Sequence, residues 1–367
     1  MTQKQIVNTQ ISEIIFKASK LSELTDKEVL FLGNYSEDHI DDLCNAASSI
    51  RDYGKGRTVT FSPKVFIPLT RLCRDYCGYC TFRVDPGQIE NLYMSPEEVL
   101  NVAKAGENLG CTEALFTLGE RPELKYVEAK EWLSIHGYDS TLDYLSAMTE
   151  LVVKETKLLP HANPGTMTHR ELNTLKDSNP STGLMLESTS ELLYQVGGPH
   201  EFAPSKRPIV RLKTISIAGE LRIPFTTGLL IGIGETMTDR MESLLEIRNL
   251  QRRFHHIQEI IIQNFRAKPE TPMAESPDAE TTEMLWTVAA ARLILGPSAN
   301  IQVPPNLSSE NYEVYLKAGI NDWGGVSPLT IDYVNPEAPW PALKNLKERT
   351  EAAGFELKPR LPVYPEY

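Results

Sequence analysis

The chain has 367 residues, of which 41% are hydrophobic and 23% charged, and its formal net charge is −12 at pH 7. These values are typical of a globular protein and exclude collagen-like chains, disulfide-stabilised miniproteins and mostly disordered proteins. The negative charge disfavours nucleic acid and anionic membranes as partners, and it favours a small substrate with little negative charge of its own.

Targeting and membrane signals are not visible in the sequence. No apolar run of about 18 residues occurs, so no membrane span is expected. The N-terminal segment MTQKQIVNTQISEIIF lacks the basic start and the long apolar core of a secretory signal. We therefore predict a cytoplasmic protein.

Helical periodicity characterises the first 55 or so residues, where Ile11, Ile14, Ile15 and Ala18 recur on one helix face. The segment YGKGR at 53–57 predicts a turn and a boundary. At the other end, a Pro-rich segment predicts an extended tail around one helix over 341–353. We expect three parts: an N-terminal helical extension (1–55), a central domain (56–335), and a C-terminal tail (336–367) packed on that domain.

Short apolar runs alternate with amphipathic stretches through the central domain. Eight runs predict buried strands, at 64–70, 113–119, 157–165, 182–188, 224–235, 257–265, 299–307 and 320–327. Helices are expected to begin at Ser95-Pro96 and near Thr168, and to cover 142–157, 208–221, a stretch ending at Phe254, 277–295 and 309–318. The alternation predicts an α/β fold, a (β/α)8 TIM-like barrel, whose reactive groups lie where strands end and helices begin.

The cysteines are the most informative residues. There are five, an odd number that argues against a disulfide framework, and Cys73, Cys77 and Cys80 form a C-x3-C-x2-C pattern after the first predicted strand. Three thiolates on one loop can bind three irons of a cube and leave the fourth iron open to a small molecule. The alternatives are a zinc site completed by a distant His and a redox pair of Cys77 and Cys80. Cys44 and Cys111 are predicted to be buried apolar residues.

This cysteine spacing, with the aromatic Tyr79 before the last cysteine, resembles the radical S-adenosylmethionine (SAM) superfamily. The resemblance implies that Cys73, Cys77 and Cys80 bind a [4Fe-4S] cluster, and that the amino and carboxylate groups of SAM chelate its open iron. The cofactor then supplies the difficult chemistry and the protein orients it.

Two further motifs support the same resemblance. TLGE at 117–120 is similar to the superfamily's GGE motif, with Leu118 in place of the first glycine, and makes Gly119 and Glu120 candidates for binding the methionine end of SAM. The segment 228–235 is similar to the G-x-I-x-G-x-x-E strand that packs along adenine, and makes Gly232 and Glu235 candidates. Glu187, at the end of the fourth predicted strand, is a candidate for the ribose hydroxyls.

Longer segments resemble the family of deazaflavin-forming FO synthases, subunit 1. They include FSPKVFIPLTRLCRDYCGYCTF, FTLGERPE, HGYDSTLDYL, LLPHANPG, IPFTTGLLIGIGET, QEIIIQNFRAK, QVPPNL and GINDWGGVSPLTIDYVNPEAPWP. The implied substrate is the adduct of tyrosine's hydroxybenzyl group with 5-amino-6-ribitylaminouracil. The implied reaction, that of a carbon–nitrogen lyase, closes a ring with loss of ammonia. Its product is 7,8-didemethyl-8-hydroxy-5-deazariboflavin (FO), the deazaflavin of coenzyme F420 biosynthesis.

The resemblance also implies the order of events and the partners. Cleavage of SAM yields a 5′-deoxyadenosyl radical that abstracts hydrogen from the substrate, and cyclisation, deamination and oxidation follow. The implied partners are the companion radical SAM protein, FO synthase subunit 2, which makes the adduct, and an electron donor such as flavodoxin or ferredoxin. Two rival hypotheses remain: another radical SAM enzyme, such as the companion subunit or a menaquinone-pathway relative, and a non-enzymatic zinc or iron–sulfur protein.

Polar and aromatic residues at the predicted strand ends are candidates for substrate binding. Neutral hydrogen-bonding groups suit a ribityl chain, and aromatic rings suit the flat rings. The candidates are Asn163, Asn264, Phe265, Asn306, Asp322 and Trp323, with His161 as a candidate for moving a proton during loss of ammonia. Each of these side chains can equally be a loop cap or a core residue.

Overall fold

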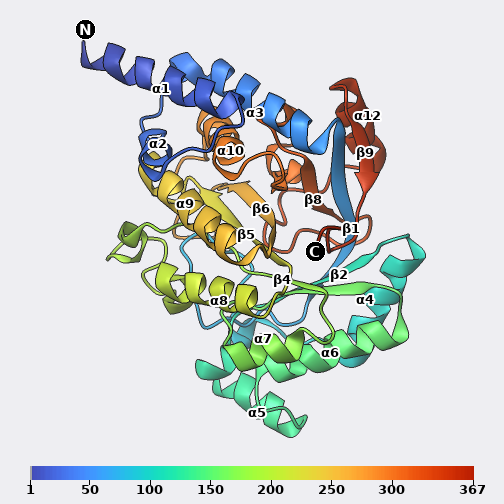
Figure 1. Cartoon of the computed structure of the whole chain (residues 1–367). Coiled ribbons are helices and arrows are strands. Elements are labelled where there is room, and N and C mark those ends of the chain that lie inside the picture. The colour runs from blue at the N-terminus through green and yellow to red at the C-terminus, as the bar shows by residue number, and fades with distance from the viewer. Residues whose placement is uncertain (1) are drawn as a thin grey trace.

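The computed structural model describes residues 2–367, and its centre is a ring of parallel strands surrounded by helices (Figure 1). The strands follow in the order β2-β3-β4-β5-β6-β7-β8-β1, and a further pairing of β1 with β2 closes the ring. Their bounds are β1 Thr58–Pro68, β2 Glu113–Thr117, β3 Leu159–Asn163, β4 Ser181–Gly183, β5 Phe225–Ile231, β6 Ile257–Asn264, β7 Ile301–Gln302 and β8 Asp322–Val326. The predicted α/β barrel is confirmed.

The barrel strands are apolar because both of their faces are covered. All residues of β5 are buried, and β6 has only two positions that are partly exposed. This pattern is expected of parallel strands with helices on one face and a packed interior on the other. The continuous apolar runs at these two strands therefore gave correct predictions.

Eight helices follow the strands or lie in the loops after them, and most begin at a visible sequence signal. Their bounds are α4 Pro96–Asn108, α5 Val127–Ile135, α6 Thr141–Glu155, α7 His169–Leu175, α8 Pro208–Glu220, α9 Met237–Phe254, α10 Thr281–Leu295 and α11 Val314–Lys317. Ser95, Thr168 and Thr236 each cap a helix and accept a hydrogen bond from the backbone N–H three residues on. The short 3-10 turns are η1 Glu37–His39, η2 Pro86–Gln88, η3 Pro122–Leu124, η4 Glu191–Tyr194, η5 Pro204–Lys206 and η6 Pro305–Ser308.

Several predicted boundaries were wrong. Helix α5 was not predicted, because its N-cap residue, Tyr126, makes no side-chain capping bond and so carries no start signal. The run 299–307 contains a strand of only two residues, Ile301–Gln302, since Pro304 and Pro305 cannot donate to a strand ladder. The helix expected over 309–318 is reduced to α11.

The N-terminal helices α1 (Gln3–Ser19), α2 (Asp26–Phe31) and α3 (Ile40–Lys55) pack against α9 and α10 at the top of Figure 1. Polar contacts also join these layers, two of them to backbone carbonyls. The Trp286 indole Nε1 donates to the carbonyl of Leu32 at 3.0 Å, and Arg248 Nη1 donates to the carbonyl of Leu24 at 2.8 Å. Among residues 2–367, no helix is long and apolar enough to cross a membrane.

The C-terminal segment contributes a strand that the sequence did not predict. After α12 (Leu343–Ala352), the chain forms β9 (Glu356–Pro359), which pairs parallel with the first residues of β1. This pairing explains why β1 begins at Thr58, earlier than the predicted start at 64. Because β9 is mostly exposed and its sequence ELKP has no apolar alternation, only the pairing itself reveals it.

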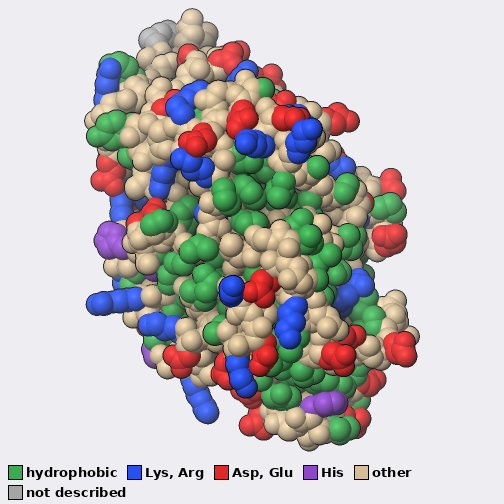
Figure 2. All heavy atoms as spheres, turned by 90° about the vertical axis from the view of Figure 1, so that its right-hand side faces the viewer, with side chains coloured by type: hydrophobic (Ala, Val, Ile, Leu, Met, Phe, Trp, Pro, Cys, Tyr) green, Lys and Arg blue, Asp and Glu red, His purple; other side chains and the backbone are tan. Residues whose placement is uncertain are grey.

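Charged side chains of both signs are interspersed with hydrophobic ones over the face drawn in Figure 2. A mixed surface of this kind favours solubility rather than attraction to a polyanion. Although the net charge is −12, the acidic side chains do not form one continuous patch on this face.

The buried imidazole of His256 should make the fold sensitive to acid. Its Nε2 contacts the carbonyl of Ile215 at 2.9 Å, and burial lowers its pKa from 6.5 to about 4. Since the unfolded chain then binds the proton more readily, stability is lost as the pH falls from 6.5 towards 4. We expect a His256→Gln variant to lose about 2 kcal/mol less than the wild type between pH 7 and pH 5.

Urea denaturation at both pH values measures this difference. The neighbouring His255 is exposed and adopts a positive φ of 54° that Asn tolerates, so His255→Asn is the matched control and should behave as the wild type. An identical acid loss in the wild type and in His256→Gln would contradict the assignment.

Candidate active site

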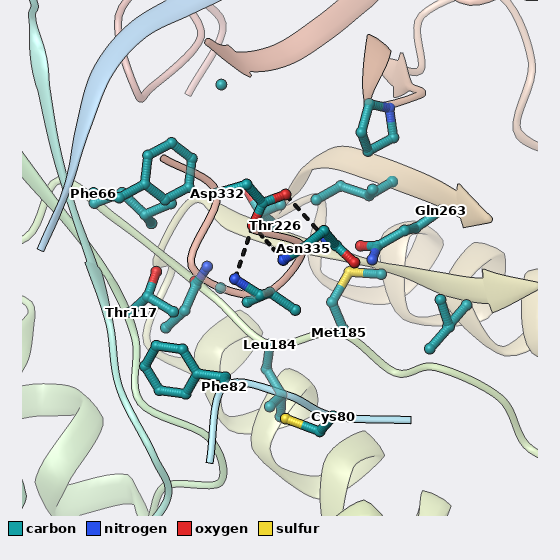
Figure 3. A pocket seen from close by; sticks show the side chains of 18 of the residues that line it. Phe66, Cys80, Phe82, Thr117, Leu184, Met185, Thr226, Gln263, Asp332 and Asn335 are labelled. Carbon is teal, nitrogen blue, oxygen red and sulfur yellow. Dashed lines mark hydrogen bonds between the residues drawn. The ribbon is translucent and has the colours of Figure 1, made fainter. Parts of the chain in front are cut away.

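A cavity of about 350 Å³ occupies the interior of the barrel and reaches the loop that follows β1. Figure 3 shows this cavity from close by, with Cys80, Phe82 and Leu184 near one another at one end and Gln263 further along. Most barrels of this fold fill their interior with side-chain layers. Open space at this position is therefore a feature that a ligand can use.

The three cysteines of the loop after β1 all line this cavity. Cys77 is buried, and Cys73 and Cys80 are partly buried. Backbone bonds hold the loop in place: Tyr76 N–H donates to the carbonyl of Phe202 at 3.0 Å and Gly78 N–H to the carbonyl of Pro199 at 2.7 Å. The segment after β4 therefore anchors the cysteine loop from outside.

The donor set fits an iron–sulfur cluster. Three thiols from one loop face one cavity, and thiolates are the usual ligands of such clusters. Burial raises the pKa of the Cys73 thiol to about 12, so the thiolate form there depends on a bound cation. In the described part of the chain, no group of three or more His, Cys, Asp and Glu side chains converges on a single metal ion. The three cysteines suit a cluster instead, because in a cluster each thiolate binds a different iron.

Gly119 allows the loop after β2 to approach the cysteine loop. Its N–H donates to the carbonyl of Thr70 at 2.9 Å. A Cβ at this position would overlap the carbonyl of Leu72 and lie 2.8 Å from the Cβ of Cys73. Glycine is therefore required here by backbone contact, whereas the neighbouring Leu118 has room for its side chain in the cavity wall.

Glu120, next along the chain, is buried and lines the cavity. Its N–H donates to Sγ of Cys73 at 3.2 Å, and its carboxylate accepts a hydrogen bond from the hydroxyl of Thr166. Arg74 lies 3.5 Å from the same carboxylate. The carboxylate is thus held beside the cysteines, where it can accept hydrogen bonds from a bound amino group.

Glu187 occupies a second acidic position in the cavity wall. It forms a buried ion pair with Lys206, whose Nζ also lies 5.8 Å from the ring centroid of Tyr79. Its φ of 66° is in the left-handed region, which is unusual for a residue other than Gly. Backbone strain of this kind is concentrated at functional sites.

Comparisons with known proteins agree with this geometry. A profile for the radical SAM superfamily matches residues 67–247. The chain is 54% identical over 309 residues to the 7,8-didemethyl-8-hydroxy-5-deazariboflavin synthase of Methanopyrus kandleri, covering 84% of this chain and 92% of that protein. It is 53% identical over 339 residues to the FO synthase of Streptomyces coelicolor, covering 90% of this chain but only 39% of that protein's length.

This chain belongs to the deazariboflavin synthase family of the radical SAM superfamily.

Solved structures support the fold. The FeFe-hydrogenase maturase HydG from Carboxydothermus hydrogenoformans superposes with a TM-score of 0.74 at 22% identity, over 97% of this chain and 82% of that one. Methylornithine synthase superposes with a TM-score of 0.71 at 18% identity, over 94% of this chain and 97% of that one. At these identities the likeness concerns the barrel alone.

The other cofactor-binding candidates, Tyr79, Gly232 and Glu235, differ in whether they line the cavity. Tyr79 lines the cavity, and its hydroxyl contacts Nε2 of His200 at 3.0 Å. Gly232 and Glu235 do not line it. Instead, the Glu235 carboxylate accepts from the backbone N–H groups of Gly232 at 2.8 Å and Ile233 at 2.9 Å, and it pairs with Arg240 at 2.8 Å. Glu235 therefore stabilises the loop after β5.

The substrate-binding candidates Asn163, Asn264 and Phe265 line the cavity, and so does His161, the candidate for proton transfer. The ring of His161 contacts Ser181 Oγ through Nδ1 at 2.7 Å and Asn163 Oδ1 through Nε2 at 3.2 Å. Burial lowers the pKa of His161 to about 4, so the imidazole is neutral at pH 7. It is therefore suited to hydrogen bonding more than to storing a proton.

The remaining three candidates lie away from the cavity lining. Asn306 donates to Asp332 at 3.0 Å and braces the loop after β8. Asp322 is the first residue of β8 and not a residue at its carboxyl end, so its carboxylate lies at the opposite end of the barrel from the cysteines. Trp323 is fully buried, and its Nε1 donates a hydrogen bond to Thr350 in α12. It faces the side of β8 opposite to Asp322, because successive side chains of a strand face opposite sides.

Sequence reasoning missed a set of charged residues that also line the cavity: Lys64, Glu113, Lys206, Arg211, Glu259 and Arg360. A signal was available for three of them. Lys64 and Glu113 open otherwise apolar strand runs, and Glu259 interrupts a third run. A charged residue inside a strand that is buried on both faces requires a partner in the barrel interior.

A Gly119→Ala substitution should disrupt the cysteine loop, because the added Cβ overlaps the backbone of Leu72. We expect the variant to lose most of its iron and sulfide after anaerobic reconstitution and to be destabilised by about 1–3 kcal/mol. Gly87, which has nothing within 4 Å of an added Cβ, provides the matched control Gly87→Ala. Full iron content in Gly119→Ala would mean that the two loops do not meet as described.

Proposed function

We propose that this chain is a radical SAM enzyme that converts the hydroxybenzyl adduct of 5-amino-6-ribitylaminouracil to FO with loss of ammonia, in coenzyme F420 biosynthesis. The observation that carries the proposal is the 54% identity to a deazariboflavin synthase over 92% of that protein. The cavity supports it, since three cysteines and two buried carboxylates meet there.

Cys73, Cys77 and Cys80 would hold a [4Fe-4S] cluster with one iron open to SAM. When bound, the cluster supplies the electron that cleaves SAM to methionine and a 5′-deoxyadenosyl radical. Residues of this chain would bind and orient the cofactor: Glu120 would accept hydrogen bonds from the methionine amino group, and Glu187 from the ribose hydroxyls. Tyr79 and the loop braced by Glu235 would complete the SAM site.

The substrate would occupy the cavity between these groups and the amino ends of the strands. Phe265 and Phe82 offer apolar surface for flat rings, and Asn163, Asn264 and neutral His161 offer hydrogen bonds. Burial of these groups excludes water from a reactive carbon radical. The reaction class is that of a ring-forming carbon–nitrogen lyase.

Partners follow from the same proposal. A companion radical SAM protein would make the adduct, as the resemblance to FO synthase subunit 1 implies. An electron donor such as flavodoxin or ferredoxin would reduce the cluster. We place this chemistry in the cytoplasm.

The decisive experiment is a coupled assay with the adduct, SAM and a reductant, followed by the fluorescence of the deazaflavin product. We expect Cys77→Ala to abolish the cluster, 5′-deoxyadenosine release and FO formation together, because two thiolates cannot hold the cubane. Cys111→Ala is the matched control, since Cys111 is buried outside the cavity and should leave all three unchanged. SAM cleavage by the wild type without FO would favour another radical SAM reaction, and zinc in place of iron would favour a non-enzymatic protein.

A second test concerns the SAM site. Glu187→Gln removes the charge opposite Lys206 while keeping the side-chain shape, and we expect the SAM dissociation constant to rise about tenfold with cluster content retained. Equilibrium dialysis with the reconstituted protein measures this constant. Glu191→Gln, an exposed carboxyl on η4, is the control. Equal affinity in the Glu187→Gln variant would remove Glu187 from the SAM site.

A further inference from the structure

The end of the cavity opposite the cysteines is built from buried charged residues. Lys64 Nζ lies 2.8 Å from a Glu113 carboxylate oxygen, and Arg360 forms ion pairs with both Glu259 and Asp322. All five are buried or nearly so, and all except Asp322 line the cavity. We call these five residues the charged floor.

The C-terminal segment closes the barrel at this end. After β9 pairs with β1, Arg360 turns inward beneath the strands, and the carbonyl of Pro362 accepts from Ser181 at 2.7 Å and Gln258 at 2.9 Å. The hydroxyl of Tyr364 donates to Asp322 at 2.8 Å. Arg360 and Pro362 line the same cavity as the cysteines, so this segment is part of the reaction chamber.

The charged floor has no excess of positive charge. Burial opposes ionisation of Glu113 and Asp322, but Lys64 and Arg360 hold their pKa values below the usual range, so both are charged. Burial raises the pKa of Glu259, and the nearby Arg360 guanidinium opposes that shift. The two cationic side chains of the floor thus face three acidic ones, and neutral His161 adds no charge.

A phosphate group bound here would be repelled by these carboxylates, because the charges would lie close together in a buried site. The cations that could pair with the phosphate already form ion pairs with the carboxylates. A hydroxyl-rich chain meets no such penalty, because each hydroxyl can donate to a carboxylate and accept from Lys64 or Arg360. Thr226 and Gln302 add neutral donors and acceptors in the wall of the same cavity. The chemistry of this end therefore suits a neutral polyol.

Aromatic surface lies further towards the cysteines. Phe66, two residues after Lys64 on β1, stacks on Trp340 with ring centroids 5.2 Å apart and planes inclined by 21°. Both rings line the cavity, and the indole Nε1 of Trp340 is buried without a hydrogen-bond partner. Flat rings with polar edges suit this pair, which would place them between the charged floor and the cysteines.

We propose that the charged floor binds the polyol end of the substrate and rejects the phosphate ester of the same polyol. This inference rests on the proposed function, since it orients the ribityl chain of that substrate. It makes Arg360, from the C-terminal segment, a specificity-determining residue of the barrel.

Equilibrium binding to the reconstituted holoenzyme tests the inference directly. The probes are 5-amino-6-ribitylaminouracil, its 5′-phosphate, and the analogue with a methyl group in place of the ribityl chain. We expect the wild type to bind the polyol about 100-fold more tightly than the phosphate ester, and more tightly than the methyl analogue. If the wild type binds the polyol and the phosphate ester with equal affinity, the inference is wrong, and no variant is needed to show it.

Variants then assign the effect to the floor. Glu113→Gln and Glu259→Gln should each lower the ratio of the affinity for the polyol to the affinity for its phosphate ester about tenfold. The control Glu356→Gln changes an exposed carboxyl in β9 and should leave the ratio unchanged. An unchanged ratio in both folded floor variants would contradict the assignment to the floor.

The outcomes separate this inference from the proposed function. If the enzyme does not convert the adduct to FO, the proposed reaction is wrong. The ratio of the affinities for the polyol and for its phosphate ester still tests the charged floor. If FO forms but the wild type accepts the phosphorylated adduct with an equal KM, the floor does not discriminate and only this inference fails.

Discussion

Closure of the parallel sheet at β1 is the constraint on which the rest of the structure depends. This strand pairs with β2, β8 and β9, whereas each other barrel strand pairs with two neighbours. Its carboxyl end leads into the cysteine loop, and Lys64, in the middle of the strand, lines the cavity as part of the charged floor. One strand therefore sets both ends of the cavity, and a shift in its register would move the cysteines and the charged floor together.

The two ends of the cavity hold their charges differently. At the floor, each carboxylate has a buried cationic or hydroxyl partner, so the ions are compensated within the protein. At the cysteines, burial raises the pKa of the Cys73 and Cys77 thiols. Compensation there has to come from a bound group. This contrast explains why the floor can be a rigid part of the fold while the cysteine end depends on its cofactor.

Close backbone approach links the cysteine loop to the carboxylates. Gly119 brings the loop after β2 against Leu72 and Cys73, and the next residue, Glu120, is then fixed beside the sulfur. Glu187 reaches the same space from the other side through a left-handed backbone conformation. Short-range steric requirements at these positions thus determine the geometry of a site whose chemistry is electrostatic.

The sequence by itself determined the barrel, the cysteine loop and the motif residues Gly119 and Glu120. These features are local: apolar runs, capping residues such as Ser95, and the spacing of thiols within one loop are all visible in short windows. Charged residues in strand runs, such as Lys64, were also visible, although their meaning depended on a partner elsewhere.

Only the tertiary structure decided which polar residues share the cavity. It brings Arg360 beside Glu259, across 101 residues of sequence, and it moves Asp322 to the amino end of β8 and Trp323 to the outside of the barrel. Strand pairing and side-chain alternation produce these placements, and a one-residue shift reverses the direction of a side chain. Contacts of this kind arise from long-range pairing, which no local pattern in the sequence records.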